Sequence, residues 1–398
     1  TGLAWPTLSN ITEDMEGVIR AGQAGMGAYT IYPTQLNAAT VGAAHWNPSV
    51  VIGQNVPVNG IIANMGTDSL VSVYVNWSFN GVAQPSISWT GLLRTYDKDT
   101  VLLGNIYPIS GTNTIKIWTS SPNNGTDDNV YNDTSTIILY GCDSLFHGTY
   151  TVGTPASDFV DLASALSSIN NCGLDGPTTL LFATGIYDGL VFNKIINGMS
   201  AINTLTIASQ TANSDDVRFT VNSGAALTLS NVNHFYFKDI TFDGSPSSQG
   251  IGVNMKGACV NIEFRNCKIL ASPTSTNTSY AFYKESGGVC DSIRLIKNVI
   301  SGGYYGLCFY GESTNVGGYN TNIYIDSNII EKAYYYSCRF YYTDLKSFSY
   351  NKIYPRVGNT DHYIRFSYTN HYNTVCNTFD YSKTNVKYAY NYFYYPHY

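Results

Sequence analysis

A short frame recurs through the C-terminal half of the chain and limits what this half can fold into. Two residues, apolar in all copies but one, stand five positions apart with Asn or Asp between them. Successive copies begin 27, 31, 30, 23, 26 and 14 residues apart, and the pairs are Phe237/Phe242, Phe264/Ile269, Leu295/Ile300, Ile325/Ile330, Phe348/Ile353, Thr374/Phe379 and Tyr388/Phe393. An irregular period of this length with strand-like alternation predicts a β-solenoid, because a short apolar strand buries its inner side only when coils stack.

Each frame also carries an Asn or Asp, which suits the turn that must end the strand: Asp239, Asn266, Asn298, Asn328, Asn351, Asn377 and Asn391. In the first two copies this residue lies one place earlier, and we interpret the set as one turn residue that shifts in position. Asn and Asp bond nearby backbone and tolerate left-handed conformations, so stacked copies would form a polar ladder. The last step of 14 residues is too short for a full coil, so we expect the solenoid to end near Tyr388 in a partial turn.

A second recurrence follows the first by roughly half a coil. Its segments superpose with steps of 27, 30 and 26 residues when they begin at Tyr280, Leu307, Ser337 and Tyr363. Each coil therefore carries at least two strands. Arg339 and Arg365 coincide in this superposition, near Glu285 and Glu312 of earlier coils. If the four point outward they form a charged strip able to hold an acidic sugar; the alternative, which we favour, is charge pairing on a solvated face.

Charge and hydropathy exclude several classes of partner. Charged residues make up 12% of the chain, against about 25% in ordinary domains. A net charge of −6 without Lys/Arg clusters argues against nucleic acid or an anionic membrane as the partner. No apolar run is long enough for a transmembrane segment. The chain starts at Thr1 with no charged-then-apolar leader, so we expect a processed product or a fragment.

Tyrosine is concentrated toward the C-terminus, where 22 of the 34 Tyr lie after residue 303. Stacked Tyr side chains offer apolar area with a polar tip, which suits sugar rings or a protein partner. The candidate contact residues are Tyr310, Tyr342 and Tyr368, together with Arg339, Arg365, Glu285 and Glu312. The alternative is that these rings stabilise neighbouring coils, and the two roles are compatible.

The N-terminal part follows another pattern. Short alternating strands broken by turns such as Asn80-Gly81 predict a β-sandwich over residues 46–143. Val73, Val75 and Trp77 share one face of their strand, as a two-sheet core requires. Residues 1–45 show no clear period and remain unassigned, as a linker or a segment that pairs elsewhere.

One loop of the sandwich concentrates oxygen ligands. Asp127, Asp128, Asn132 and Asp133 lie within seven residues of one another and supply part of the six to eight oxygens that calcium requires. A solvated turn rich in Asn and Asp is the alternative that the residue types favour. We therefore expect no cofactor, with structural calcium as the one exception to test.

Eight cysteines without a CxxC pair fit neither a zinc site nor a disulfide scaffold. The candidate bridges are Cys142 with Cys172, across the junction of the two domains, and Cys259 with Cys290, between adjacent coils, whose spacing of 31 residues matches the local step. Buried free thiols are the alternative for both pairs.

Two groups of motifs resemble a known combination of domains. Asn76-Trp-Ser-Phe-Asn-Gly81 and Gly111-Thr-Asn-Thr-Ile-Lys-Ile-Trp118 resemble the CARDB-type immunoglobulin-like domains of secreted Bacteroidota proteins. Gly148-Thr-Tyr-Thr-Val-Gly153 and Cys172-Gly-Leu-Asp-Gly-Pro177 resemble the start of a pectate-lyase-like right-handed parallel β-helix in surface proteins of that group. The resemblance implies export and work at the cell surface, and it carries no catalytic residue over.

The segment before the first coil is expected to form a capping helix. Phe159, Leu162, Leu166 and Ile169 recur at helical spacing, Ser157 or Asp158 suits the N-cap, and Gly173 suits the end. Its apolar stripe would cover the open end of the solenoid. An uncovered end would expose unpaired strand edges.

The sequence therefore predicts an all-β chain, with an immunoglobulin-like β-sandwich (46–143) followed by a capped right-handed parallel β-helix (144–398). The acid and base residues of pectinase-type hydrolases are not recognisable, so we expect a non-enzymatic extracellular adhesin or surface-fibre subunit. Its Tyr-rich faces would contact glycan or protein, with self-assembly as a further possibility. The alternatives from other classes are a β-helical polysaccharide lyase or hydrolase and a carbohydrate-binding module.

Overall fold

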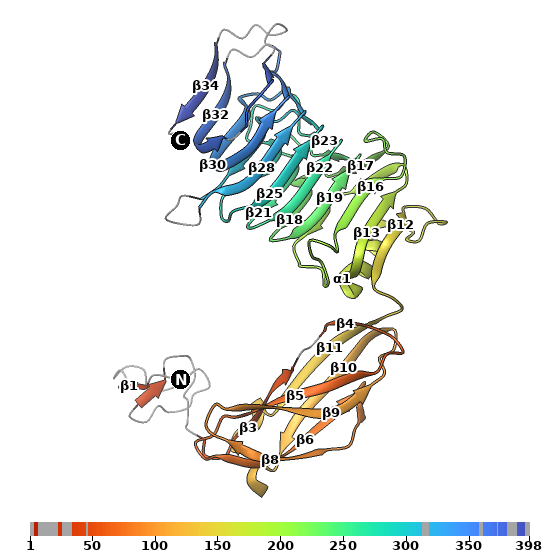
Figure 1. Cartoon of the computed structure of the whole chain (residues 1–398), viewed down its shortest axis with the longest axis vertical. Coiled ribbons are helices and arrows are strands. Elements are labelled where there is room, and N and C mark those ends of the chain that lie inside the picture. Colours follow the sequence, from red (N-terminus) through yellow and green to blue (C-terminus); the bar gives the residue numbers. More distant parts are fainter. Residues whose placement is uncertain are drawn as a thin grey trace. The chain divides into compact units, whose positions relative to one another are not determined.

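The computed structural model describes residues 34–44, 47–312, 318–357, 364–369 and 373–379, and the backbone of the strands within 4–6, 23–25, 361–371 and 388–394. The chain divides into two units, Thr1–Ser144 and Leu145–Tyr398, whose strands and helix are labelled along the ribbon in Figure 1. The described helical residues include no stretch that is both long and apolar enough to cross a membrane.

The first unit contains a β-sandwich. One sheet has the strand order β4-β11-β10-β6-β7 with β8 on β6, and the other has the order β3-β5-β9. The elements are β3 (Ala38–Ala43), β4 (Ser49–Val51), β5 (Val56–Asn64), β6 (Leu70–Phe79), β7 (Val82–Ala83), β8 (Ile87–Leu93), β9 (Lys98–Ile106), β10 (Gly111–Ser120), η1 (Pro122–Asn124), η2 (Val130–Asn132) and β11 (Thr134–Cys142). Two short strands, β1 (Ala4–Pro6) and β2 (Gln23–Gly25), pair with each other. Strand β3 lies in the segment that the sequence left unassigned.

Alternation along the strands builds the sandwich core. Val73, Val75 and Trp77 of β6 are at most 2% exposed, so their predicted common face is the inner one. Trp77 donates its indole N–H to the Pro85 carbonyl, and Trp89 donates to Asp99 at 2.7 Å. These indoles are packed and hydrogen-bonded in the core, as buried Trp side chains require.

The second unit is a right-handed parallel β-helix, as predicted. The sheet of third strands shows eight coils: β14 (Gly185–Asp188), β17 (Val217–Thr220), β20 (Thr241–Asp243), β23 (Lys268–Leu270), β26 (Val299–Ser301), β29 (Ile329–Glu331), β31 (Lys352–Tyr354) and β33 (Thr378–Phe379). Figure 1 shows the strands stacked coil upon coil.

The other two rows of strands join into one 15-stranded sheet, because β30 (Tyr336–Ser349) runs through both. We call the first row the front row: β12 (Phe146–Val152), β13 (Leu174–Phe182), β16 (Leu205–Ser209), β19 (Asn233–Lys238), β22 (Val260–Arg265), β25 (Asp291–Ile296) and β28 (Asn320–Asp326). The second is the back row: β15 (Leu190–Phe192), β18 (Ala225–Ser230), β21 (Ile251–Lys256), β24 (Tyr280–Lys284), β27 (Tyr305–Tyr310), β30, β32 (Asp361–His371) and β34 (Tyr388–Tyr394).

The predicted frame is the inner register of this helix. Its first residues stack in the order Phe237, Phe264, Leu295, Ile325 and Phe348. Its second residues stack in the order Phe242, Ile269, Ile300, Ile330, Ile353 and Phe379. Apart from Phe379 in the last of these coils, all of these side chains are at most 1% exposed. The prediction that the frame residues form the core is therefore confirmed for the described copies.

The Asn and Asp of the frame occupy two separate columns, which corrects the interpretation of one shifting turn residue. The second position after the first frame residue is always left-handed, with φ between 53° and 61° at Asp239, Asn266, Lys297, Ser327, Tyr350 and Cys376. The third position faces inward and holds Ile240, Cys267, Asn298, Asn328, Asn351 and Asn377. The turn therefore accepts several residue types, and the ladder of Asn belongs to the inner column alone.

The inner Asn column is fully hydrogen-bonded, and Asn328 is representative. Its Oδ1 accepts from the backbone N–H of Asn298 at 2.8 Å, and its Nδ2 donates to the Leu295 carbonyl at 2.8 Å and to Asn351 Oδ1 at 3.1 Å. Asn298, Asn328 and Asn351 are at most 1% exposed. The ladder thus ties three successive coils through bonds that water cannot reach.

The final copy of the frame, Tyr388/Phe393, does not belong to the same row of strands as the other copies. Tyr388 pairs with Asp361 and Phe393 with Phe366, so this segment is strand β34 of the back row. The short step of 14 residues is the distance from one row to the next, not a partial turn. The two rows share the same alternation, and only pairing distinguishes them.

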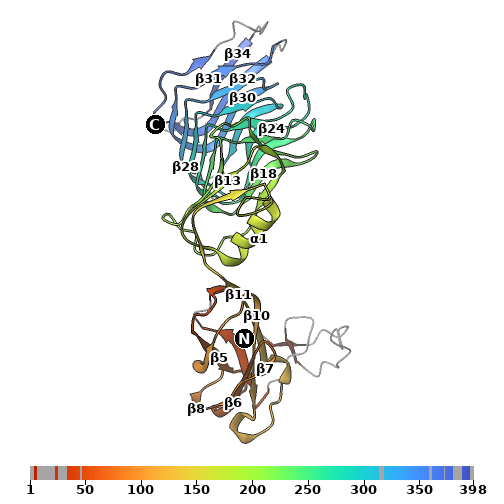
Figure 2. The ribbon, with the colours of Figure 1, turned by 90° about the vertical axis from the view of Figure 1, so that its right-hand side faces the viewer.

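Helix α1 (Leu162–Cys172) caps the first coil, as Figure 2 shows. Its residues Ala165 and Ile169 are fully buried, and Gly173 ends the helix with φ 77°. The N-cap is Asp161 rather than Ser157 or Asp158, because Asp158 instead accepts from the Thr151 N–H and hydroxyl. Phe159 pairs with Val152 outside the helix.

Asp161→Ala is expected to lower the melting temperature of the β-helix unit, because the Asp161 carboxylate accepts from the Ser164 N–H at 2.8 Å. This bond lowers the pKa of Asp161, so its stabilisation is present above the ordinary value of 3.8 and is lost as pH falls through the lowered pKa. Melting curves at neutral and acid pH measure the effect. Asp161→Asn is the control, since Asn also caps helices; an equal loss in both variants would contradict the assignment.

Candidate functional site

Tyrosines that lie outside the hydrophobic core line the back row of the β-helix over three coils, where Tyr280 and Tyr305 are half-buried and Tyr336 is buried. Tyr280 of β24, Tyr305 of β27 and Tyr336 of β30 stack with ring centroids 5.0 and 5.7 Å apart. The neighbouring positions add Tyr283, Tyr310 and Tyr341, and we call these six residues the Tyr face. The predicted superposition of these strands was shifted: Tyr280 aligns with Tyr305 rather than with Leu307.

Arg339 lies within the Tyr face. Its guanidinium carbon is 5.1 Å from the Tyr310 ring, 5.4 Å from that of Tyr336 and 5.8 Å from that of Tyr305. Its Nε is buried with no hydrogen-bond partner, and among the residues the structure describes the side chain has no ion pair. The positive charge is therefore held by ring faces, without a carboxylate beside it.

Burial keeps the phenols of this surface neutral. It raises the pKa of Tyr310, and also those of Tyr280 and Tyr305, above their ordinary value. Cys308 lies in the same row between Tyr283 and Arg339, and burial raises the pKa of its thiol as well. The Tyr face thus presents hydroxyl donors, aromatic rings and one cation.

The predicted charge pairing does not include Arg339, which makes no ion pair with Glu285 or Glu312 among the residues that the structure describes. Arg339 and Arg365 do align in adjacent strands. Glu285, however, accepts from Asn254 at 2.6 Å and lies 3.4 Å from Lys256, while Glu312 accepts from the backbone N–H of Gly288. Glu285 directly follows β24 and Glu312 lies two residues after β27, so both carboxylates bond groups at the turns.

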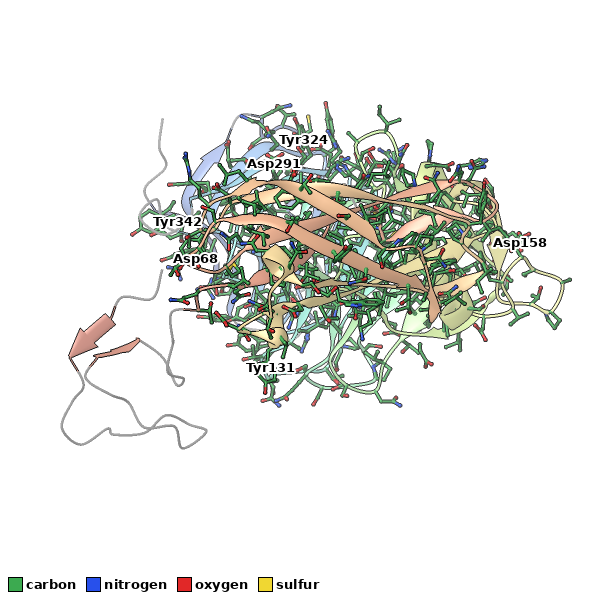
Figure 3. All side chains as sticks on the ribbon, turned by 90° about the horizontal axis from the view of Figure 1, so that it is seen from below. Asp68, Tyr131, Asp158, Asp291, Tyr324 and Tyr342 are labelled. Atoms are coloured by element: carbon green, nitrogen blue, oxygen red, sulfur yellow. The ribbon has the colours of Figure 1, made fainter. Side chains whose placement is uncertain are left out.

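Tyr342 and Tyr368 lie beside the Tyr face, where each has a left-handed backbone with φ 45° and 50°. Their rings stack in parallel at 4.6 Å, and Tyr319 meets Tyr342 edge to face at 5.7 Å. Figure 3 labels Tyr342. The three predicted tyrosines Tyr310, Tyr342 and Tyr368 therefore share one region.

The sequence did not indicate a groove on the front row. This groove has a volume of about 610 Å³, which is within the range of ligand sites. Its lining includes small side chains of the first coils and larger ones of the next: Thr179, Leu181, Thr206, Ala208, Ser209, Ala212, Tyr236, Phe237, Lys238, Asp239, Glu263 and Arg265. Two columns of side chains change in size between the second and third of these coils, and this change makes the hollow. The columns are Thr179–Thr206–Tyr236–Glu263 and Leu181–Ala208–Lys238–Arg265.

The charges in the groove are partly paired. Arg265 Nε donates to Glu263 at 2.6 Å, and Asn266 donates to Asp239 at 3.1 Å. Lys238 makes no ion pair with any residue that the structure describes. Only pairing of the strands brings these residues together, so no local motif revealed them.

The predicted calcium loop is held against the segment before β3. Asp128 accepts from the backbone N–H groups of Gln35 and Leu36 at 2.9 Å each, and Asp127 accepts from that of Ala38 at 2.8 Å. Asp128 is exposed and serves as a cap for that segment. The solvated-turn alternative thus explains Asp128.

Beside Asp127 the structure leaves oxygens without donors. The side-chain oxygens Asn37 Oδ1, Asn132 Oδ1 and Asp133 Oδ1 are buried and have no hydrogen-bond partner. Burial, and then the nearby Asp127 carboxylate, raises the pKa of Asp133 to about 6. No group of three or more His, Cys, Asp or Glu gathers anywhere in the described ranges, so amide oxygens would have to complete any metal site.

The candidate disulfide cysteines differ in state. Cys142 and Cys172 are disulfide-bonded. Cys259 and Cys290 are free buried thiols rather than the predicted bridge. A hydrogen bond with Cys290 lowers the pKa of Cys259 to about 7, and burial raises that of Cys290. The two cysteines occupy equivalent positions of adjacent coils, which explains their matching spacing.

Comparisons with known proteins return only distant similarities to solved structures. No family model matches the chain, and no curated protein matches it. The CARDB domain of a Pyrococcus furiosus protein, in complex with di-metal ions, is 16% identical with a TM-score of 0.23, over 28% of this chain and 94% of that one. A domain from Methanosarcina acetivorans, provisionally named as part of a cell surface protein, is 17% identical with a TM-score of 0.25, over 29% and 98%.

A pectin methylesterase from Aspergillus niger is similar over 62% of this chain and 91% of that one, with 14% identity and a TM-score of 0.34. These likenesses concern the fold alone. The CARDB type of the sandwich and the origin of the chain in Bacteroidota stay predictions. The chain is an all-β protein that joins an immunoglobulin-like sandwich to a capped parallel β-helix.

Proposed function

We propose that this chain is a non-enzymatic extracellular surface protein, an adhesin or surface-fibre subunit, that binds a glycan through the Tyr face. The observation that carries the proposal is the row of stacked Tyr rings over three coils, with Arg339 among them. Aromatic rings offer sugar rings apolar area, and phenol hydroxyls bond sugar hydroxyls. The disulfide-bonded Cys142 and Cys172 support an oxidising compartment outside the cytoplasm.

A panel of immobilised polysaccharides tests the proposal when retention and new chain ends are scored together. Tyr305→Ala is expected to weaken retention roughly 3- to 10-fold, because it removes the central ring of the Tyr face. The control is Tyr131→Ala in the first unit: Tyr131 is 96% exposed, and its label marks it in Figure 3. Equal retention by both variants, or no retention of any glycan, would overturn glycan binding by the Tyr face.

The alternative of a lyase or hydrolase is favoured by one observation, the groove that holds Glu263, Arg265, Lys238 and Asp239. Paired carboxylates and cations are the residue types of acid and base catalysis. New chain ends that disappear in Glu263→Gln but persist in Tyr305→Ala would establish this alternative. They would contradict the proposal that the protein is non-enzymatic.

Self-assembly is a separate part of the proposal. Strand β34 pairs with β32 and with no other strand that the structure describes, so a further chain could pair along its other edge. Light scattering of the full chain and of a chain without residues 1–45 measures the association. Monomers in both preparations would remove this part and leave glycan binding untouched.

We also propose that a hard cation such as calcium binds among Asn37, Asp127, Asn132 and Asp133. Three buried oxygens without donors and two neighbouring carboxylates are what such a cation would neutralise. Calcium added after chelation is then expected to raise the melting temperature of the first unit. An unchanged melting temperature would remove the site.

The pH dependence of the first unit supplies an independent test. Without a cation, the raised pKa of Asp133 means that stability is present near pH 4 and is lost as pH rises through about 6. Asp133→Asn keeps an oxygen but removes the charge, so it should abolish this loss. Melting temperatures of both proteins from pH 4 to 7, with Asp127 and Asp128 unchanged in both, measure the difference. Parallel curves would contradict the assignment to Asp133.

A further inference from the structure

We infer that the glycan bound by the Tyr face is acidic, and that its carboxylate or sulfate groups bind between Arg339 and Arg365. This inference rests on the proposed function and names the chemical class of its ligand. It begins from Arg339, whose charge has no carboxylate partner among the residues that the structure describes.

The two arginines are in register on neighbouring strands, Arg339 in β30 and Arg365 in β32. Neighbouring strands lie about 4.8 Å apart, and like charges placed directly opposite on such strands repel each other. The predicted glutamate partners are occupied at the turns of earlier coils. An anion between the two guanidinium groups would be attracted to both and would offset their repulsion.

The surroundings of Arg339 strengthen its contact with an anionic ligand. Three Tyr rings approach its guanidinium within 5.1 to 5.8 Å and exclude water from one side. Its Nε is buried without a partner. A cation that is already partly desolvated loses less hydration when an anion arrives, so an ionic contact there is stronger than one on an open surface.

Arg365 is held differently, and its position suits a second contact. Its guanidinium carbon is 6.0 Å from the Tyr341 ring, and its Nε donates to the Ser367 hydroxyl at 3.0 Å. Tyr341 lies two residues after Arg339 on the same strand, so the ring beside Arg365 and the Arg339 side chain belong to one strand. The pattern of rings and guanidinium groups along the coils matches a glycan chain whose rings stack on Tyr and whose acidic groups recur.

Binding of four probes tests the inference: polygalacturonate, its carboxyl-reduced derivative, dextran sulfate and dextran. The natural sequence is expected to bind an acidic probe at least 10-fold more tightly than the matching neutral one, and binding should weaken with salt. Arg339→Gln should remove most of this preference, and Arg339→Lys should restore part of it, because Lys keeps the charge without the fork. Preference for polygalacturonate identifies carboxylate as the group, and preference for dextran sulfate identifies sulfate.

The charge control is Lys352→Gln, which removes one positive charge from an exposed position of β31 in the third sheet. Equal binding of acidic and neutral probes would overturn the inference while leaving glycan binding by the Tyr face in place. Binding of no probe, with no retention on the polysaccharide panel, would overturn both. An equal loss of preference in Lys352→Gln and Arg339→Gln would show a general charge effect and would also overturn the inference.

Discussion

Replacing Asn328 with Ala is expected to lower the free energy of unfolding of the β-helix by about 3–5 kcal/mol. The substitution removes the acceptor of the Asn298 N–H and the donor to the Leu295 carbonyl, in a region that water does not reach. It also leaves the Asn298 amide with its bond to the Phe264 carbonyl alone. A buried polar group without a partner costs about 1–3 kcal/mol. Chemical denaturation of the natural sequence and the variant measures the loss.

The matched control is Asn266→Gly, which removes the same type of side chain from the left-handed position of the equivalent turn, two coils earlier. Asn266 is exposed, bonds only the Asp239 side chain through its amide, and has a left-handed φ of 54° that Gly adopts without strain. We expect a change within about 1 kcal/mol there. Similar losses at Asn266 and Asn328 would contradict the separation of the two columns.

Replacing Lys284 with Ala is expected to destabilise the β-helix by about 3–5 kcal/mol, since it combines a cavity with unpaired carbonyls. Lys284 is fully buried, and its ammonium donates to the carbonyls of Glu285, Gly288 and Tyr310, with 2.8 Å to Gly288. Lys284→Met should lose less, because Met fills a similar volume. Denaturation of the three proteins gives the order.

Lys268→Ala is the control for the loss of a lysine, because Lys268 is paired with Asp215 at the surface, where an ion pair contributes about 0–1 kcal/mol. Burial lowers the pKa of Lys284. The natural sequence should therefore gain stability relative to Lys284→Met as pH rises toward the ordinary lysine value of 10.5. No difference between Lys268→Ala and Lys284→Ala would refute a structural role for the buried ammonium.

The frame shows how far a sequence pattern reaches. Phe237, Phe264 and Leu295 were assigned to one inner column because residues that stack in a solenoid recur at the coil period. The same period misplaced Tyr388 and Phe393, since both rows of strands alternate in the same way. Local spacing identifies a strand but does not say which neighbour it pairs with.

The candidate site was predictable from the sequence only in part. The Tyr-rich region and the alignment of Arg339 with Arg365 were predictable, because both follow from composition and period. The contacts of Arg339 with Tyr305 and Tyr310 were not, since they join two coils. The front-row groove also had no sequence signal, because Thr206 and Lys238 form its step only after the coils stack.

The sequence by itself determined the fold class, the coil period, the core register and the capping helix, because alternation and turn chemistry act over short stretches of chain. Only the tertiary structure decided which Asn face inward, which row holds the last strand and which groups surround each charge. These depend on pairing between residues about 30 positions apart, where Asn298 meets Asn328. A pattern read along one strand carries no information on that pairing, so the environment of Arg339 became visible only in the folded chain.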